Sequence, residues 1–73
     1  MTTTNYRLTA WINGVEQESV LVDRDTLNML GGYYCGAITA MNVVLDGGLI
    51  VYVQPTDGSD AYFLIGADAN YFC

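Results

Sequence analysis

The dipeptide Asn13-Gly14 constrains the fold most, because it stands between two runs in which apolar and polar residues alternate. Asn-Gly tolerates the two positive φ angles of a type I′ turn, and the twist of that turn matches the twist of paired strands. Residues 5–22 are therefore predicted to form a β-hairpin. The predicted pairs are Ile12 with Val15, Trp11 with Glu16, Ala10 with Gln17, Leu8 with Ser19, and Tyr6 with Leu21.

The two faces of this hairpin differ in polarity. One face has the composition of a core face and comprises Tyr6, Leu8, Ile12, Val15 and Leu21. The other face comprises Arg7, Thr9, Trp11, Glu16, Glu18 and Val20. Trp11 is therefore predicted on the outer face of the hairpin, beside the carboxylates of Glu16 and Glu18.

A stretch without any charged residue, 26–45, follows the hairpin. Asp23 or Asp25 is suited to cap a helix at its start, because a carboxylate accepts the free backbone N–H groups of the first turn. Apolar residues then recur at helical spacing, at Leu27, Leu30, Tyr34, Ala37 with Ile38, and Met41. This spacing predicts a helix that begins near Thr26.

The end of this helix has two interpretations, because Gly31, Gly32 and Gly36 each cost about 1 kcal/mol relative to alanine inside a helix. In the first, one helix continues to Met41. In the second, a short helix ends at Gly31 and a strand begins with the sequence YYCGAIT. We favour the first, because the apolar period continues past the glycines.

The same stretch has the length of a membrane span but not its composition, since it contains Asn28, Asn42 and several glycines and lacks a basic anchor. We therefore expect no membrane contact. A helix that is apolar on most sides is expected to pack on the sheet with one face. Its other face, with Met29, Tyr33 and Ala40, is a candidate contact with a second subunit.

The remainder of the chain is predicted to form strands. Asp46-Gly47-Gly48 lies between two runs rich in β-branched residues and predicts a second hairpin. Residues 55–60 have the composition of a turn, and residues 61–67 are predicted as a further strand. The expected fold class is α+β in a single domain spanning 1–73. An N-terminal β-hairpin is followed by one helix and an antiparallel β-meander, in the order ββαβββ or ββαββ.

The charge balance narrows the possible partners. The chain has two Arg, no Lys and no His, against eight acids, for a net charge of -6. Direct binding of nucleic acid is disfavoured, because phosphates require basic side chains. A basic protein partner is favoured instead. The N-terminal residues lack the pattern of a signal peptide, which predicts a cytoplasmic location. Cys35 and Cys73 are then expected as thiols, although a disulfide between them stays open.

No motif in the sequence predicts catalysis, a metal or a cofactor. The thiols have no His to activate them, and Ser19 and Ser59 have no base other than carboxylates. Asp57 and Asp60 lie in a turn with oxygen ligands, but the alternating ligands of a calcium loop are missing. We therefore predict a protein that is not an enzyme and that binds neither a metal nor a cofactor.

The acids together with Trp11 are the candidate binding residues. The predicted partner-binding set is Trp11, Glu16, Glu18, Asp23, Asp25, Asp46, Asp57 and Asp60. In length, acidity and compact α+β pattern the chain resembles the small acidic inhibitors encoded by phages, of the anti-CRISPR and anti-restriction type. The resemblance is one of overall character and involves no specific motif.

This resemblance implies a non-enzymatic inhibitor that acts in the host cytoplasm. It would block a basic, nucleic-acid-binding site on a host defence protein or nucleoprotein complex. Blocking by charge, as in a DNA mimic, and blocking by shape both stay open. The alternative is a structural or assembly module that acts as a homo-oligomer, for example a homodimer in a phage virion, because the apolar content of 52% exceeds the needs of a small core.

Overall fold

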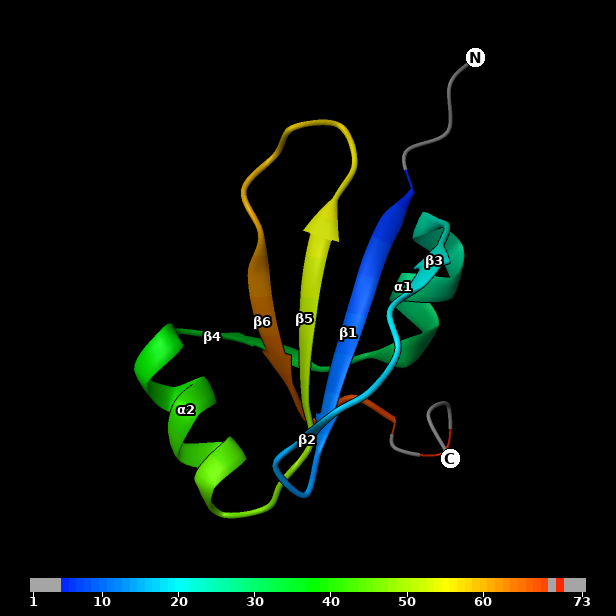
Figure 1. Cartoon of the computed structure of the whole chain (residues 1–73). Helices are drawn as coiled ribbons and strands as arrows, with labels where there is room; N and C mark the ends of the chain where they lie inside the picture. Colours follow the sequence, from blue (N-terminus) through cyan, green and yellow to red (C-terminus); the bar gives the residue numbers. More distant parts are fainter. Residues whose placement is uncertain (1–4, 69, 71–73) are drawn as a thin grey trace.

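In a computed structural model, which describes residues 5–68 and 70, the chain forms one antiparallel sheet and two helices (Figure 1). The strands are β1 (Tyr6–Ile12), β2 (Val15–Glu16), β3 (Val20–Val22), β4 (Tyr33–Cys35), β5 (Ile50–Pro55) and β6 (Tyr62–Ile65). The helices are α1 (Arg24–Leu30) and α2 (Ala37–Leu45). Across the sheet the strands follow the order β2-β1-β5-β6-β4, and β3 also pairs with β1. The predicted α+β class is confirmed.

The predicted hairpin is confirmed at its turn and wrong in register further away. Asn13 and Gly14 have φ angles of 52° and 78°, as a type I′ turn requires. Trp11 pairs with Glu16 as predicted, but Tyr6 pairs with Val22 and not with Leu21. One extra residue in the segment 17–19 separates β2 from β3 and causes the shift.

This extra residue moves side chains to the opposite face of the strand, because successive side chains in a strand alternate. Val22 is buried in place of Leu21, which is 59% exposed. Val15, beside the turn, is also exposed and not part of the core. The prediction that Leu21 and Val15 belong to the core face is therefore wrong.

The prediction of one helix from Thr26 to Met41 is wrong, because α1 ends at Leu30. Gly31 has φ 67° and ψ −149°, and Gly32 has φ 95°, so neither residue continues a helix. The chain then forms the edge strand β4, which pairs with β6. The helical apolar period returns only in α2. The second interpretation was right about Gly31 and the strand, but it did not include a second helix.

The predicted hairpin at Asp46-Gly47-Gly48 is also wrong, because Val43 and Val44 belong to α2. Gly47, with φ 81°, ends the helix in the left-handed conformation. The Gly47 N–H donates to the Val44 carbonyl over 3.1 Å, and the Gly48 N–H donates to the Val43 carbonyl over 2.9 Å. These two bonds form a Schellman motif. The pair Asp46-Gly47 therefore ends a helix in this fold and does not form a hairpin turn.

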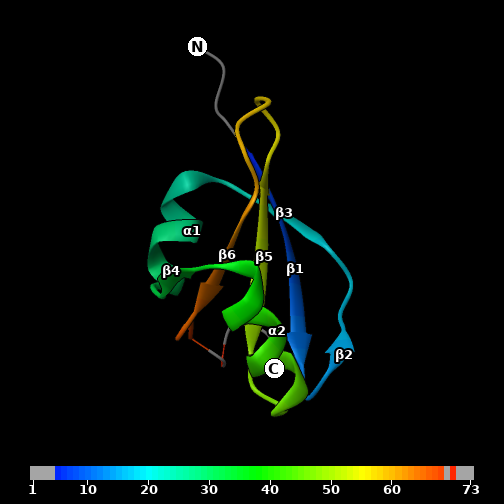
Figure 2. The same ribbon diagram turned by 90° about the vertical axis from the view of Figure 1, so that its left-hand side faces the viewer.

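The two helices pack on opposite faces of the sheet, and this leaves one face partly open. Figure 2 shows α1 to one side of the strands and α2 at their lower end. The core on the α1 face comprises Tyr6, Leu8, Val22, Leu27, Leu30, Val51, Val53 and Leu64. On the opposite face α2 covers only the end of the sheet near Trp11 and Ile50. The rest of that face is not covered by a helix, and two hollows lie on it.

Asp23 is the N-cap residue of α1, and it should make stability depend on pH. The Thr26 N–H donates to Asp23 Oδ1 over 2.8 Å, and this hydrogen bond lowers the pKa of Asp23. The ionised cap therefore stabilises the fold above about pH 4, and this contribution is lost as the pH falls through the lowered pKa.

Asparagine caps a helix without titrating. Between about pH 6 and pH 2 we therefore expect the melting temperature of Asp23→Asn to fall less than that of the wild type. Some acid sensitivity should persist in the variant, because a hydrogen bond from Ser59 also lowers the pKa of Asp57. Thermal melts at several pH values measure the difference. Equal losses in the two proteins would contradict the capping role of the carboxylate.

Candidate functional site

A groove lies between α2 and the sheet on the partly open face. It has a volume of about 290 Å³, and we call it the α2 groove. Its lining is apolar and comprises Trp11, Ala37, Ala40, Met41, Val44, Ile50 and Phe63. Ala37 and Ala40 are small and lie one turn apart on α2, so the wall that the helix contributes is low. The aromatic rings of Trp11 and Phe63 form part of the sheet side.

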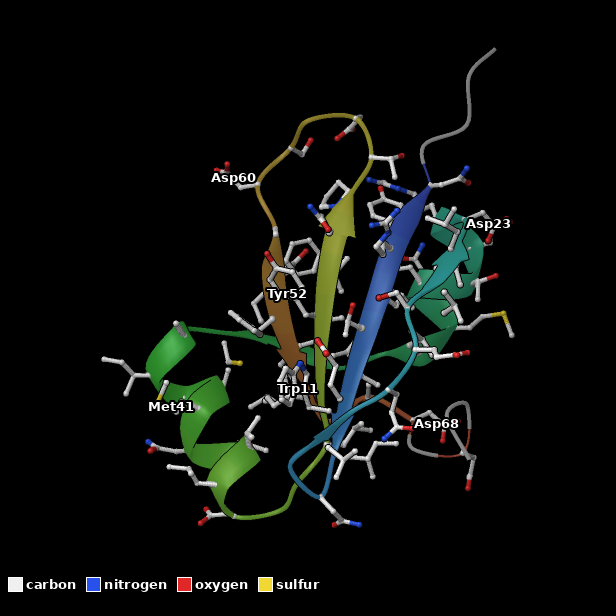
Figure 3. All side chains as sticks on the ribbon, viewed as in Figure 1. Trp11, Asp23, Met41, Tyr52, Asp60 and Asp68 are labelled. Atoms are coloured by element: carbon white, nitrogen blue, oxygen red, sulfur yellow. The ribbon has the colours of Figure 1, made fainter. Side chains whose placement is uncertain are left out.

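A second hollow continues from the α2 groove across the open sheet, and we call it the sheet hollow. Its lining comprises Thr9, Trp11, Glu16, Tyr52 and Phe63, so it shares Trp11 and Phe63 with the groove. The rings of Tyr52 and Phe63 lie 5.0 Å apart between centroids, at an interplanar angle of 46°. Figure 3 shows Tyr52 above Trp11 on the same face of the sheet. The two hollows together form one apolar surface that contains the rings of Trp11, Tyr52 and Phe63, and we call it the aromatic surface.

The outer face of α2 extends this surface with exposed apolar side chains. Ile38, Met41 and Leu45 are 82%, 65% and 77% exposed, and they lie at helical spacing. Only Ala40 of this helix is fully buried. Large exposed apolar surfaces on a small domain are typical of contact sites. We therefore regard α2 with its groove as the leading candidate for a binding surface.

The predicted contact face with Met29, Tyr33 and Ala40 does not exist as one face of a helix, because the three residues lie in three different elements. Met29 and Tyr33 are strongly exposed, as expected of residues that would meet a second subunit. They belong to α1 and β4, however, and not to one helix. Ala40, the third predicted member, is buried between α2 and the sheet.

Of the predicted partner-binding residues, the fold brings Trp11 and Glu16 together. They are direct cross-strand partners, and both line the sheet hollow. Trp11 is half-buried, so its ring is partly covered and partly available. Glu18 is exposed and lies two residues further on, in the irregular segment between β2 and β3.

The other predicted acids are distributed over the molecule and do not form one cluster. Asp23 and Asp25 lie at the start of α1, Asp46 follows the end of α2, and Asp57 and Asp60 lie in the loop between β5 and β6. Figure 3 shows Asp23 and Asp60 on opposite sides of the upper end, with Asp68 near the lower end. The acids are therefore spread over both faces of the sheet, while α2 itself carries no charge.

The local hydrogen bonds explain the pKa values of two of these acids. Hydrogen bonding to the side chain and the backbone of Ser59 lowers the pKa of Asp57, and the Ser59 N–H donates to Asp57 Oδ1 over 2.9 Å. Asp23 is held in the same way by Thr26. Both carboxylates are thus fully charged near neutral pH and are available at the surface.

Groups suited to chemistry are sparse in the described part of the chain. Within residues 5–68 and 70, no three His, Cys, Asp or Glu side chains lie close enough to hold a metal ion. Cys35 is half-buried on β4 opposite Phe63. Cys73 lies outside the described residues, and so does the question of its pairing with Cys35. No helix among the described residues is long and apolar enough to cross a membrane.

Sequence reasoning did not single out four residues that line the two hollows, namely Val44, Ile50, Tyr52 and Phe63. The available signal was the continuous apolar run at residues 49–53 and again at 61–65, which makes both faces of these strands apolar. Such strands need cover on two sides. Comparison with protein-family models, curated proteins and solved structures found no match to this chain.

Proposed function

We propose that this protein is a non-enzymatic binding protein that docks on a basic partner through the aromatic surface beside α2. The observation that carries the proposal is the position of Trp11, which lies half-buried at the junction of two apolar hollows and directly opposite Glu16. Aromatic side chains in such positions are typical anchors of protein interfaces. A carboxylate at the border of the anchor steers a basic partner toward it.

The partner class follows from the charge of the whole chain. With a net charge of -6 and acids on several sides, the protein attracts basic surfaces over long range. Of the two bases, Arg24 donates to the Tyr6 hydroxyl over 3.3 Å and 3.4 Å. We propose that the partner surface is a nucleic-acid-binding site on a host defence complex, as for the anti-CRISPR and anti-restriction inhibitors that the chain resembles. The scattered acids and the uncharged α2 favour blocking by shape over charge mimicry.

Removing the two carboxylates nearest Trp11 should slow association with this partner. We expect the double variant Glu16→Gln, Glu18→Gln to associate roughly threefold to tenfold more slowly at low salt, with a flatter salt dependence. Its melting temperature should stay unchanged, because both side chains are exposed. The measurement is binding kinetics on a panel of purified CRISPR effector complexes and restriction nucleases at about 50 and 500 mM salt.

The matched control is Asp25→Asn with Asp68→Asn, which removes the same charge away from Trp11. An equal slowing in the control would mean that net charge acts without a localised site. Binding to no member of the panel would refute the proposed host target, and affinity that does not change with salt would refute docking on a basic surface.

A second candidate function is a structural or assembly module that works as a homo-oligomer. The apolar stripe of Ile38, Met41 and Leu45 favours it, because the same stripe on two copies is self-complementary. A stable interface of this kind buries more than about 1,000 Å². Light scattering of the free protein at about 100 µM separates the candidates, since an interface of that size is occupied at this concentration.

A further inference from the structure

The α2 groove is apolar inside, and acidic residues stand in the segments beside it. Every residue that lines the groove itself is uncharged. In the adjoining sheet hollow the one charged lining residue is Glu16. Asp46 follows α2 directly, and the last turn of the helix contains no basic residue. The negative end of the helix dipole adds to the charge of Asp46.

We propose that the α2 groove receives one large apolar side chain from a partner segment that carries Lys or Arg on both sides of that side chain. This inference rests on the proposed function and names the part of the partner that the site recognises. The groove volume of about 290 Å³ is sufficient. An apolar cavity of about 150 Å³ already holds a benzene molecule, so an aromatic or large aliphatic side chain fits.

The borders of the groove complement the charges of such a segment. One basic flank would meet Glu16 on β2, and the other would meet Asp46 at the end of α2. The turns that follow β1 and α2 lie together, since a Cβ on Gly14 would lie 3.7 Å from the Val44 carbonyl oxygen. The two carboxylates therefore belong to neighbouring segments at one end of the groove.

A second copy of the chain fits the same groove less well. Each copy carries a net charge of -6 and has only Arg7 and Arg24 as bases. Arg24 lies on the α1 side, where it donates to Tyr6. A second copy therefore brings acids to acidic borders, whereas a basic segment neutralises them.

Trp11 provides the readout, because it lines the groove and is the only tryptophan in the chain. The probes are two synthetic peptides with the same central Leu-Phe pair, one flanked by two Lys on each side and one flanked by two Glu. We expect the Lys peptide to shift Trp11 emission and to bind at least about tenfold more tightly at low salt. The preference should shrink between about 50 and 500 mM salt.

Two substitutions of exposed alanines locate the binding site. Ala37→Phe fills the groove from the start of α2 and should abolish the response to the Lys peptide. Ala61→Phe adds the same side chain in the loop between β5 and β6, outside the groove, and should leave the response unchanged. A third variant, Met41→Lys, adds a base at an exposed lining position and should lower the preference for the Lys peptide. Circular dichroism confirms that each variant is folded.

The outcomes separate this inference from the proposed function. Equal binding of the two peptides, or an unchanged response in folded Ala37→Phe, would overturn the inference. Self-association of the free protein that Ala37→Phe removes would also overturn it and would assign the groove to a second copy. Selective binding of the Lys peptide supports the inference even where the nuclease panel shows no partner, in which case the proposed host target alone is wrong.

Discussion

Replacing Gly32 by alanine is expected to lower the free energy of unfolding by about 3 kcal/mol. Gly32 has φ 95°, a conformation that alanine adopts only with strain. Its added Cβ would lie 2.9 Å from the Ile65 carbonyl oxygen and 3.3 Å from the Ala67 nitrogen. Both are backbone atoms, one in the last residue of β6 and the other two residues later. They cannot move without disturbing the sheet. Urea unfolding, followed by circular dichroism, measures the loss.

The sign of this change distinguishes the two interpretations of residues 26–41. In one continuous helix, the same substitution would stabilise the protein by about 1 kcal/mol, because alanine is the better helix former. Gly36→Ala is the matched control, since Gly36 has φ −77° and a Cβ there meets no atom within 4 Å. Gly36 is also the N-cap of α2, where alanine is less favourable, but alanine lowers the entropy of the unfolded chain, so we expect this control to change stability by less than about 1 kcal/mol. A stabilising Gly32→Ala would disprove the break between α1 and β4.

Replacing Leu30 by alanine is expected to cost about 3 kcal/mol of unfolding free energy. Leu30 is 3% exposed and packs with Leu27 into the core on the α1 face. The truncation removes buried apolar contacts and leaves a cavity between α1 and the sheet. A domain of this length has a total stability of only several kcal/mol. Urea unfolding should therefore show a markedly lower midpoint for Leu30→Ala than for the wild type.

The adjacent residue supplies the control for this second prediction. Met29 lies on the same helix and is 82% exposed. Met29→Ala changes helix propensity about as little as Leu30→Ala does, so the two variants differ mainly in burial. We expect Met29→Ala to stay within about 0.5 kcal/mol of the wild type. Similar losses in both variants would contradict the packing of α1 by its Leu27 and Leu30 face.

Local features of the fold could be predicted from the sequence because a few neighbouring residues decide them. Asn13 and Gly14 adopt positive φ angles at little cost, and this is sufficient to specify the hairpin turn and the pair of Trp11 with Glu16. Asp23 caps α1 through an oxygen that reaches a backbone N–H three residues later. The α+β class followed from these local signals and from the apolar spacing of α1.

Non-local features could not be predicted in the same way, because they depend on residues far apart in the chain. The break at Gly32 is decided by β6, some thirty residues later, whose backbone approaches too closely for a side chain. Val43 and Val44 suit a strand by their propensity, yet they form a helix because the sheet near Ile50 needs apolar cover. β propensity depends strongly on such context.

The candidate site shows the same division. The sequence by itself determined that Trp11 and Glu16 lie side by side, because a two-residue turn leaves no freedom in the register next to it. It also determined the charge of -6, on which the proposed class of partner rests. Only the tertiary structure decided that α2 covers one end of the sheet and that the aromatic surface beside it stays open. Packing of distant apolar segments creates that groove, and no short run of residues encodes it.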